Sequence, residues 1–465
     1  MRKVQMVKLL ALLLVLALFG EKPSQAQEKS APVHVILITI DTLSANYLSL
    51  YGYKHKTTPF LDSLRKEGVL FNNAYTLATQ SAPSHASILT SVHPATLGMY
   101  KNGIPLEQRW KTLAEILKEH DYINWAWVNA HAMSAPVTNF NQGYDRFHTV
   151  SELEKVHSRA KPVSRILSES SAKLREAAKK YPGKPLHFWF HFNFAHSPYR
   201  YPKIKRFKSM YRVTGEKQLK VKQIKAIHMK QRLPSDIELS VLEARYLRSI
   251  HYIDETLREL FTVLSETSIR NNSIVAIVAD HGETFQIGSP GGHSGVLLDD
   301  VLHIPMMLLF PGNEFAGRSI NHLVDQRDIL PTILHQLTIP VPTQTQGRSL
   351  LPMIEGDRVW KEHFVATIAS PFALFTARNM EWKYIEAGQK GGLKNHLDVF
   401  PFLPSAVTSY IGESHAQNIE APAAVQDRLT SVVTSLRNNL GSRSNSQISN
   451  QAIEALRISG YLNPD

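Results

Sequence analysis

The stretch at residues 33–40 reads VHVILITI, an almost unbroken run of β-branched and apolar residues. Such a run predicts a strand buried on both faces, and strands of this kind belong to sheets that helices cover on both sides. Four similar runs follow along the chain, at residues 123–128, 186–194, 273–279 and 305–310. Helical patterns separate these runs. The alternation predicts an α/β fold with a mostly parallel central sheet and helices on both of its faces.

The pattern changes after about residue 370 and predicts a second, smaller unit. We expect the main α/β domain over residues 32–370 and a small C-terminal α+β subdomain over residues 371–465. Within the second unit, residues 373–376 and 382–387 are typical of a β-hairpin. A tail helix is expected after a tract rich in Ser and Asn.

The first 26 residues have the layout of a secretory signal peptide. Basic residues precede an apolar run from Leu9 to Gly20, and residues 24–26 offer small side chains for cleavage. An anchor that stays uncleaved has a similar layout, although this run is short for a membrane span. No later stretch is long and apolar enough to span, so we expect an exported protein without a transmembrane body.

Cysteine usage narrows the expected compartment. The chain contains no cysteine, which excludes disulfides, thiolate metal ligands and a thiol nucleophile. An exported chain without disulfides is more typical of a bacterial periplasm or cell surface, or of bacterial secretion, than of an animal secretion.

The positive charge of the chain is local. The formal net charge is +12, and residues 203–232 hold eleven Lys and Arg against one acid, Glu216. This basic insertion is either a solvated surface segment or a surface that attracts a sulfated polysaccharide or the headgroups of anionic lipids. Nucleic acid is not an expected partner, because the chain is expected to be exported and has no nucleic-acid-binding motif.

Polar residues able to bind a cation follow two of the expected strands. Asp41 follows the first, and Asp280 and His281 follow the run at 273–279. Parallel strands end at the same edge of a sheet, so these side chains are expected to converge. Two carboxylates and an imidazole suit one divalent cation, Ca²⁺ first, with Mn²⁺, Mg²⁺ or Zn²⁺ as alternatives. Capping of the following turns is the other interpretation of the same residues.

The stretch TQSAPSHASILTS at residues 79–91 predicts the start of a helix. Ser81 would then lie near the helix N-terminus, where free N–H groups and the helix dipole favour an anion. A serine oxygen between that terminus and a cation would be placed to attack a sulfate or phosphate ester. Simple capping by Ser81 and Ser84 is the alternative.

Six blocks of sequence in a fixed order carry a resemblance to a known family. They read ILITIDTLSANYLSLYGY, TPFLDSLRKEGVLFNNAY, SAPSHASILTS, HFNFAHSPY, IVADHGETF and GHSGVLLDDVLHIPMMLLFPG. In this order they resemble the sulfatase family, within the alkaline phosphatase superfamily. The resemblance runs from about residue 33 to 385, with a further match in the tail at 455–462. It implies an α/β hydrolase that acts on sulfate esters.

The resemblance also implies roles for the residues of the site. Asp41, Asp280 and His281 would hold the metal. Ser81 matches the position that active members oxidise to formylglycine. His85 lies where the maturation signature of the family has Arg, and it is counted here among the candidate catalytic residues.

Three further positions match, and several depart from the family pattern. Asn102 resembles a polar contact to the ester. His196 and His293 resemble the groups that bind the anion and protonate the leaving oxygen. Thr42 stands where a second Asp is usual, and the segment VNAHAM lacks the usual Lys. Other histidines without a motif are expected to be ordinary surface or core residues: His55, His120, His157 and His228.

The state of Ser81 separates the candidate functions. A formylglycine hydrate can release sulfate by breaking a carbon–oxygen bond, which indicates sulfate ester hydrolysis. A plain serine favours a phosphodiesterase or a phospho-group transferase, because phosphorus accepts a second attack more readily when a metal polarises it. The third candidate is a non-catalytic protein that keeps the fold and binds polyanions.

Overall fold

The central sheet of the protein has eight strands, in the order β4-β3-β5-β1-β6-β7-β2-β8. Their bounds are β1 His34–Ile40, β2 Val69–Tyr75, β3 Ile123–Val128, β4 Arg146–Thr149, β5 Leu186–Phe192, β6 Ser273–Ala279, β7 Met306–Leu309 and β8 Ser319–Asp325. This computed structural model describes residues 31–149, 162–199, 201, 205–214, 219–228, 232–286, 291–356, 365–369, 374–387, 406–410 and 422–441.

The pairing of the strands confirms the mostly parallel sheet expected from the sequence. β7 pairs antiparallel with both β6 and β2, and the other pairings of this sheet are parallel. All five apolar runs form strands, with ends shifted by up to two residues. β4 and β8 were not expected. β4 is short, and its first three residues are only half-buried. β8 alternates exposed and buried residues only at its start. Neither strand therefore has the long apolar run of a central strand.

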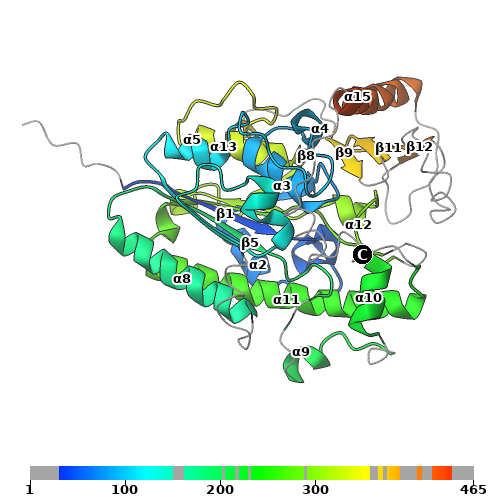
Figure 1. Ribbon diagram of the computed structural model, residues 1–465, viewed down its shortest axis with the longest axis horizontal. Coiled ribbons are helices and arrows are strands. Elements are labelled where there is room, and N and C mark those ends of the chain that lie inside the picture. Colours follow the sequence, from blue (N-terminus) through cyan, green and yellow to red (C-terminus); the bar gives the residue numbers. More distant parts are fainter. Residues whose placement is uncertain are drawn as a thin grey trace, which may run out of the picture. The chain divides into compact units, whose positions relative to one another are not determined.

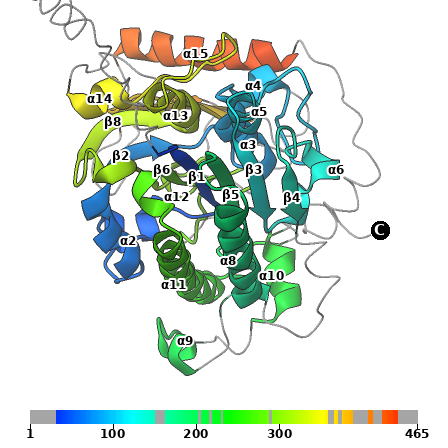
Figure 2. The ribbon, with the colours of Figure 1, turned by 90° about the vertical axis from the view of Figure 1, so that its left-hand side faces the viewer.

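Helices cover both faces of the sheet, also as expected. α8 Pro162–Lys180 and α11 Asp236–Glu266 lie on one face, while α3 Ser81–Thr90, α5 Leu113–Lys118 and α13 Ile329–Gln336 lie on the other (Figures 1 and 2). The remaining helices are α2 Pro59–Leu64, α4 Pro94–Leu97, α6 Ala135–Thr138, α9 Lys205–Ser209, α10 Val221–His228, α12 Asp299–Leu302, α14 Leu351–Glu355 and α15 Ala423–Gly441. Across the described ranges, none of these helices has both the length and the hydropathy of a membrane span.

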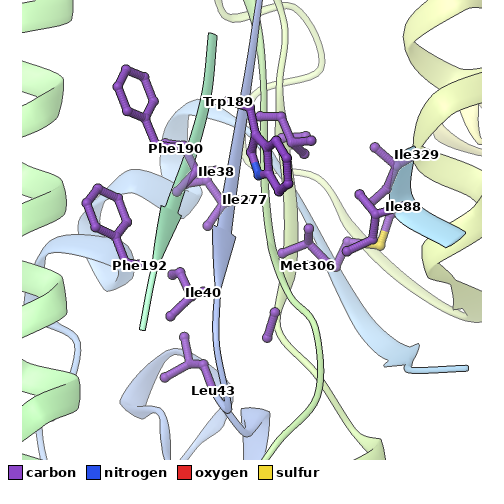
Figure 3. Packing of buried hydrophobic residues seen from close by; sticks show 14 of the residues in the cluster. Ile38, Ile40, Leu43, Ile88, Trp189, Phe190, Phe192, Ile277, Met306 and Ile329 are labelled. Atoms are coloured by element: carbon purple, nitrogen blue, oxygen red, sulfur yellow. The ribbon is translucent and has the colours of Figure 1, made fainter. Parts of the chain in front are cut away.

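The core follows the two-residue periodicity of the central strands. Figure 3 shows Phe190 and Phe192 of β5 on one side of the sheet and Trp189 on the other. On the Trp189 side, Ile88 of α3 and Ile329 of α13 pack together, and all of these side chains are at most 1% exposed. Burying one large apolar side chain contributes about 1.5–3 kcal/mol, so this layer holds the strand ends in fixed positions.

A second sheet follows the central one in the chain. Its strands, in the order β12-β11-β10-β9, are all antiparallel. Their bounds are β9 Val365–Ala369, β10 Leu374–Arg378, β11 Trp382–Ala387 and β12 Ala406–Tyr410, so the expected hairpin is confirmed as β10–β11. α15 packs against β10 and β11. The expected boundary at residue 370 stays a prediction, although β9 already belongs to this sheet. The expected signal peptide and tail helix lie outside the described residues.

Hydrogen bonds and ion pairs join the second sheet to the central domain. Thr367 of β9 donates its hydroxyl to the backbone oxygen of Thr76 at 2.6 Å. Asp299 of α12 accepts from Lys383 at 2.7 Å and from Arg378 at 3.1 Å. Burial opposes ionisation of Asp299, but Lys383 and Arg378 outweigh it and hold the pKa of Asp299 well below its usual value.

Candidate active site

The register of the central strands brings Asp41 and Asp280 together. β1 and β6 are parallel neighbours, with Ile40 opposite Ala279, so the residue after each strand emerges at the same edge. The N–H of Asp280 bonds the backbone oxygen of Ile40 at 3.3 Å. Asp41, Asp280 and His281 are all buried, and one ligand atom from each lies within 4.8 Å of the others. The three residues expected to hold a metal therefore converge.

Two oxygens in this cluster lack hydrogen-bond partners. Oδ1 of Asp280 accepts from the N–H groups of Thr42 at 3.0 Å and His281 at 2.7 Å. Within the part of the chain that the structure describes, Oδ2 of Asp280 and Oδ1 of Asp41 accept no hydrogen bond. Leaving a buried polar atom unsatisfied costs about 1–3 kcal/mol, and more if it is charged. A divalent cation bound by these oxygens and by the His281 imidazole would satisfy them, so the residues present fit such an ion.

The two carboxyl groups differ in their affinity for a proton. Burial, followed by the charges of Asp280 and Glu283, raises the pKa of Asp41 well above its usual value. Burial also opposes ionisation of Asp280. His281 and the N–H of Thr42 stabilise its carboxylate, and the pKa of Asp280 is lowered. The two carboxyl groups of the cluster are therefore shifted in opposite directions, Asp41 toward the protonated form and Asp280 toward the ionised form.

Thr42 occupies a strained backbone conformation beside these acids. Its φ of 57° is in the left-handed region, which is rare for a β-branched residue. The N–H of Thr42 donates to Asp280, and its backbone oxygen accepts from the hydroxyl of Tyr246 on α11 at 2.7 Å. Strain of this kind persists only where surrounding contacts over-determine it. Here the strained turn aims a backbone N–H at the Asp280 carboxylate.

Ser81 is the first residue of α3, so the helix predicted at residues 79–91 is confirmed. Its hydroxyl oxygen lies 3.4 Å from Nε2 of His281. Asn102 shapes this terminus through two hydrogen bonds. Its side-chain oxygen accepts from the N–H of Ala82 at 2.8 Å, and its backbone N–H donates to Oε1 of Gln80 at 2.8 Å. Nδ2 of Asn102 is buried and makes no hydrogen bond to the described residues. The helix start thus presents the serine oxygen to the carboxylate cluster.

His85 lies one turn further along α3 and is completely buried. Its Nδ1 is 2.8 Å from the backbone oxygen of Ser81 and 3.7 Å from Oδ2 of Asp280. Burial lowers the pKa of His85 against the opposing charge of Asp280, which favours the neutral ring. The His85 ring therefore contacts both the backbone oxygen of Ser81 and the carboxylate of Asp280.

His191 is a residue of this site that the sequence analysis missed. It lies on β5, its Nδ1 bonds the hydroxyl of Thr39 at 2.9 Å, and its Nε2 lies 3.8 Å from Asp41. Its ring meets that of His85 edge-on, with centroids 4.7 Å apart. A polar residue inside the apolar run LHFWFHF was the available signal, since a buried imidazole in a central strand needs partners.

His196 and His293 also meet at this edge. Their ring centroids are 5.3 Å apart, and the His293 ring stacks on that of His281 at 4.4 Å. Nδ1 of His293 lies 3.2 Å from Glu283, and Nδ1 of His196 lies 2.9 Å from the backbone oxygen of Ser197. A third ring, that of His228 on α10, lies 5.4 Å from each of them. His228 was expected to be an ordinary surface or core residue. The structure corrects this, because the end of α10 brings it to the site.

The site places a candidate nucleophile at a helix N-terminus, opposite acids at the ends of parallel strands, an arrangement suited to hydrolysis of an anionic ester. The family model described as Sulfatase matches residues 33–339. The chain therefore belongs to the sulfatase family, the sulfuric ester hydrolases, as the resemblance implied.

Individual proteins agree with this assignment. An arylsulfatase of Clostridium perfringens is 24% identical, covering 75% of this chain and 86% of its own length. The phosphonate monoester hydrolase from Silicibacter pomeroyi has a TM-score of 0.66 at 17% identity, covering 90% of this chain and 97% of its own. A structure in complex with D-glucosamine-2-N,6-O-disulfate has a TM-score of 0.63 at 17% identity, covering 89% and 99%. The two solved structures support the fold.

Proposed function

We propose that this chain is an exported, metal-dependent hydrolase of sulfate esters on anionic saccharides, with residue 81 as the nucleophile. One observation carries the proposal. Ser81 begins a helix with its hydroxyl oxygen 3.4 Å from His281, beside two buried carboxyl groups that each keep an oxygen without a partner among the described residues. This arrangement offers a nucleophile, cation ligands and a helix N-terminus in one place.

Each residue of the site has a role in the proposed reaction. Asp41, Asp280 and His281 would hold the divalent cation, Ca²⁺ first. The cation would polarise the ester and favour ionisation of the nucleophile. The N-terminus of α3, shaped by Asn102, favours the charge of the sulfate group. His85, through the backbone of Ser81, keeps the first turn in position.

His196 and His293 are the proposed proton donors to the leaving oxygen. Each has its Nδ1 within hydrogen-bond distance of a fixed oxygen, on Ser197 and Glu283 respectively. Such a contact holds the ring in one orientation and sets the tautomer. An imidazole held in this way can donate a proton to a leaving oxygen, which suits a general acid.

The basic insertion supports an anionic saccharide as the substrate. Its helices α9 and α10 bury Phe207, Ile224 and Ile227 and expose Lys and Arg on their other sides. The exposed cationic residues of the two helices are Lys205, Arg206, Lys208, Lys222 and Lys225. A one-sided array of cations attracts a polyanion and raises its local concentration. The structural neighbour bound to a disulfated glucosamine is consistent with this class of substrate.

A hollow beside the insertion adds to this support. It has a volume of about 590 Å³ and is lined in part by Tyr53, Lys54, Tyr211 and Arg212, none of which belongs to the Ser81 site. Aromatic faces and cations together suit a sulfated sugar ring. We propose that a neighbouring unit of the saccharide occupies this hollow.

Export is part of the proposal. It rests on the signal-like layout of residues 1–26 and on the absence of cysteine from the sequence. A bacterial periplasm, cell surface or secreted state would give the enzyme access to extracellular sulfated polymers.

Mass spectrometry of the peptide that contains Ser81 tests the sulfatase chemistry directly. Protein purified from its native host is expected to yield a peptide lighter by two hydrogen atoms than the serine form, as formylglycine requires. The same preparation should release sulfate from sulfated saccharides in a metal-dependent way. A plain serine together with no sulfate release would refute the proposal.

The second candidate is hydrolysis of phosphate diesters or phosphonate esters by plain Ser81. Two observations favour it, the buried His85 in place of the Arg of the maturation signature and the structural likeness to a phosphonate monoester hydrolase. A phosphoseryl intermediate trapped on Ser81 would support this candidate over the first. Polyanion binding with no turnover under any metal would instead support the non-catalytic alternative.

A further inference from the structure

We infer that His196, His228 and His293 form a second cation site, specific for Zn²⁺ or a similar transition metal, that ties the basic insertion to the active site. One ligand nitrogen from each residue lies within 4.8 Å of the others. The three ring centroids are 5.3–5.4 Å apart. The inference rests on the proposed function for its catalytic meaning and changes one part of it: with this cation bound, His196 and His293 would hold the metal and would not donate a proton to the leaving oxygen. The binding of the metal can be measured independently.

The chemistry of the three ligands selects the metal. An all-imidazole set suits Zn²⁺, Cu²⁺, Ni²⁺ or Co²⁺, whereas Ca²⁺ and Mg²⁺ require oxygen ligands. Zn–N bonds of about 2.0–2.1 Å in a tetrahedral site place the nitrogens roughly 3.3 Å apart. The nitrogens therefore need to approach by at most about 1.5 Å, within the reach of side-chain rotations. Three protein ligands leave the fourth position open, as in catalytic zinc sites.

The outer contacts of two of these rings are those of metal-binding histidines. A histidine that binds a metal usually directs its other ring nitrogen at a carboxylate or a backbone oxygen. Nδ1 of His293 lies 3.2 Å from the buried carboxylate of Glu283, and Nδ1 of His196 lies 2.9 Å from the backbone oxygen of Ser197. In the proposed site, Nε2 of each ring would be the atom that binds the metal. These contacts are independent of the clustering of the rings.

The packing of α10 explains how His228 reaches the cluster. Ile224 and Ile227 are each 1% exposed, and Ile224 lies one turn before the half-buried His228, on the same side of the helix. The loop that carries His293 passes directly beneath this side. At Gly291, which has a φ of 64°, an added Cβ would lie 3.7 Å from Cγ2 of Ile227. The insertion is therefore packed against the loop that supplies the second ligand.

The charge balance of the site gives the second cation a purpose. Asp41, Asp280 and Glu283 place three buried carboxyl groups at this edge, and a sulfated substrate brings further negative charge. One divalent cation on Asp41 and Asp280 balances at most two of these charges. A second cation on the three imidazoles would add two positive charges. The sulfate group of the substrate would then interact with this metal and not directly with the imidazoles.

Metal binding to the full-length protein tests the site. After chelator treatment, the chain would be titrated with Zn²⁺ and its metal content measured by elemental analysis, with Co²⁺ as a spectroscopic substitute. His228→Gln is expected to bind one equivalent fewer than the unaltered protein. The matched control, His120→Gln, changes an exposed histidine between α5 and β3 and should bind as many equivalents as the unaltered protein.

A rescue variant guards against misfolding. Because the chain contains no cysteine, His228→Cys introduces a unique thiol, which should restore the missing equivalent and give a sulfur-to-cobalt charge-transfer absorption. Zn²⁺ should also slow tryptic cleavage of the insertion in the unaltered protein and in His228→Cys, but not in His228→Gln. Equal zinc content in His228→Gln and the unaltered protein would overturn the inference, as would rescue without the cobalt absorption.

The outcomes separate this inference from the proposed function. Asp280→Ala should lose the cation of the carboxylate site and keep the equivalent that depends on His228. Normal zinc binding at the three histidines without any sulfate release would refute the function alone. Sulfate release at a normal rate by His228→Gln, with an unchanged metal content, would refute the second site alone.

Discussion

Two buried carboxyl groups of this protein lie in contrasting surroundings. Asp254 on α11 accepts hydrogen bonds from the backbone N–H groups of Phe60 at 2.8 Å and Leu61 at 2.9 Å, one to each oxygen, at the start of α2. Asp280 receives two backbone N–H groups on one oxygen, while its other oxygen accepts no hydrogen bond from the described residues. Both are completely buried. The difference separates a buried acid whose two oxygens both serve the backbone from one that keeps an oxygen able to bind a ligand.

The largest expected effect comes from the residue that faces the open oxygens. Ser81→Ala should reduce kcat by at least about 10⁴-fold, because removal of a catalytic nucleophile costs about 10⁴–10⁶-fold in well-studied hydrolases. Its metal content and thermal unfolding should stay unchanged, since the Ser81 hydroxyl is not a proposed cation ligand. Steady-state kinetics and elemental analysis check both points. Activity above one hundredth of normal would remove Ser81 from the mechanism.

Asp280→Ala tests whether the acid with the open oxygen binds the cation. Mutation of a residue that only hydrogen-bonds to a metal ligand typically lowers the metal affinity about 10–100-fold. Removal of a direct ligand should therefore lower it at least about 100-fold. Equilibrium dialysis should therefore show loss of the cation bound by Asp41, Asp280 and His281, with loss of turnover. An unchanged metal affinity would show that Asp280 acts only as a cap.

Asp254→Asn tests whether the other buried acid has only a structural role. Metal content and kcat should stay normal, because Asp254 serves the start of α2. Burial raises the pKa of Asp254 to about 6, so the folded protein holds a proton between about pH 4 and 6 that the unfolded chain has released. Asp254 therefore lowers stability as the pH rises through that window, by about 2–3 kcal/mol in all.

The asparagine variant should lose this part of the pH dependence. Urea unfolding of both proteins at pH 4.5 and pH 7 would measure it. A smaller fall in stability over this range for Asp254→Asn is the expected result. An identical fall in the two proteins would contradict the assignment of the proton to Asp254.

The smallest effect is expected at the exposed cations of the insertion. Replacing Lys220, Lys222 and Lys225 with Gln should weaken binding of a sulfated polymer several-fold at low salt and hardly at all at high salt, because exposed charges are screened. A matched control replaces Lys179, Lys180 and Lys184, which are exposed and precede β5 at the opposite edge of the sheet. Turnover of a small sulfate ester should stay normal in both. Equal weakening in the control would remove the special role of the insertion.

Much of the fold and part of the site could be predicted from the sequence, for a physical reason. A strand buried on both faces must be apolar along its length, so the first polar residue marks its end. This signal predicts Asp41 and Asp280, and parallel pairing predicts that they meet. β7 is different, because its apolar run carries no information about its direction. Its antiparallel pairing depends on the segment between β6 and β7, which brings the chain back to the sheet at the edge where β6 ends.

The histidines show where such prediction stops. His196 and His293 lie in motifs that resemble those of the family, and they are found together. His228 has no motif, and only the packing of Ile224 and Ile227 turns it toward them. His191 lies within a strand that was predicted, but its role depends on the neighbouring α3, which brings His85 against it. Contacts between distant elements decide both cases, and no local pattern encodes them.

The reversed direction of β7 has a consequence for how this protein can be altered. A crossover to a parallel strand would carry the chain to the far edge of the sheet, whereas the connection from β6 to β7 leaves and re-enters at the same edge. One continuous segment, residues 280–305, thus carries Asp280, His281, Glu283 and His293. A homologous segment could be transplanted between the two strands to change the chemistry of the site, with the sheet itself kept intact.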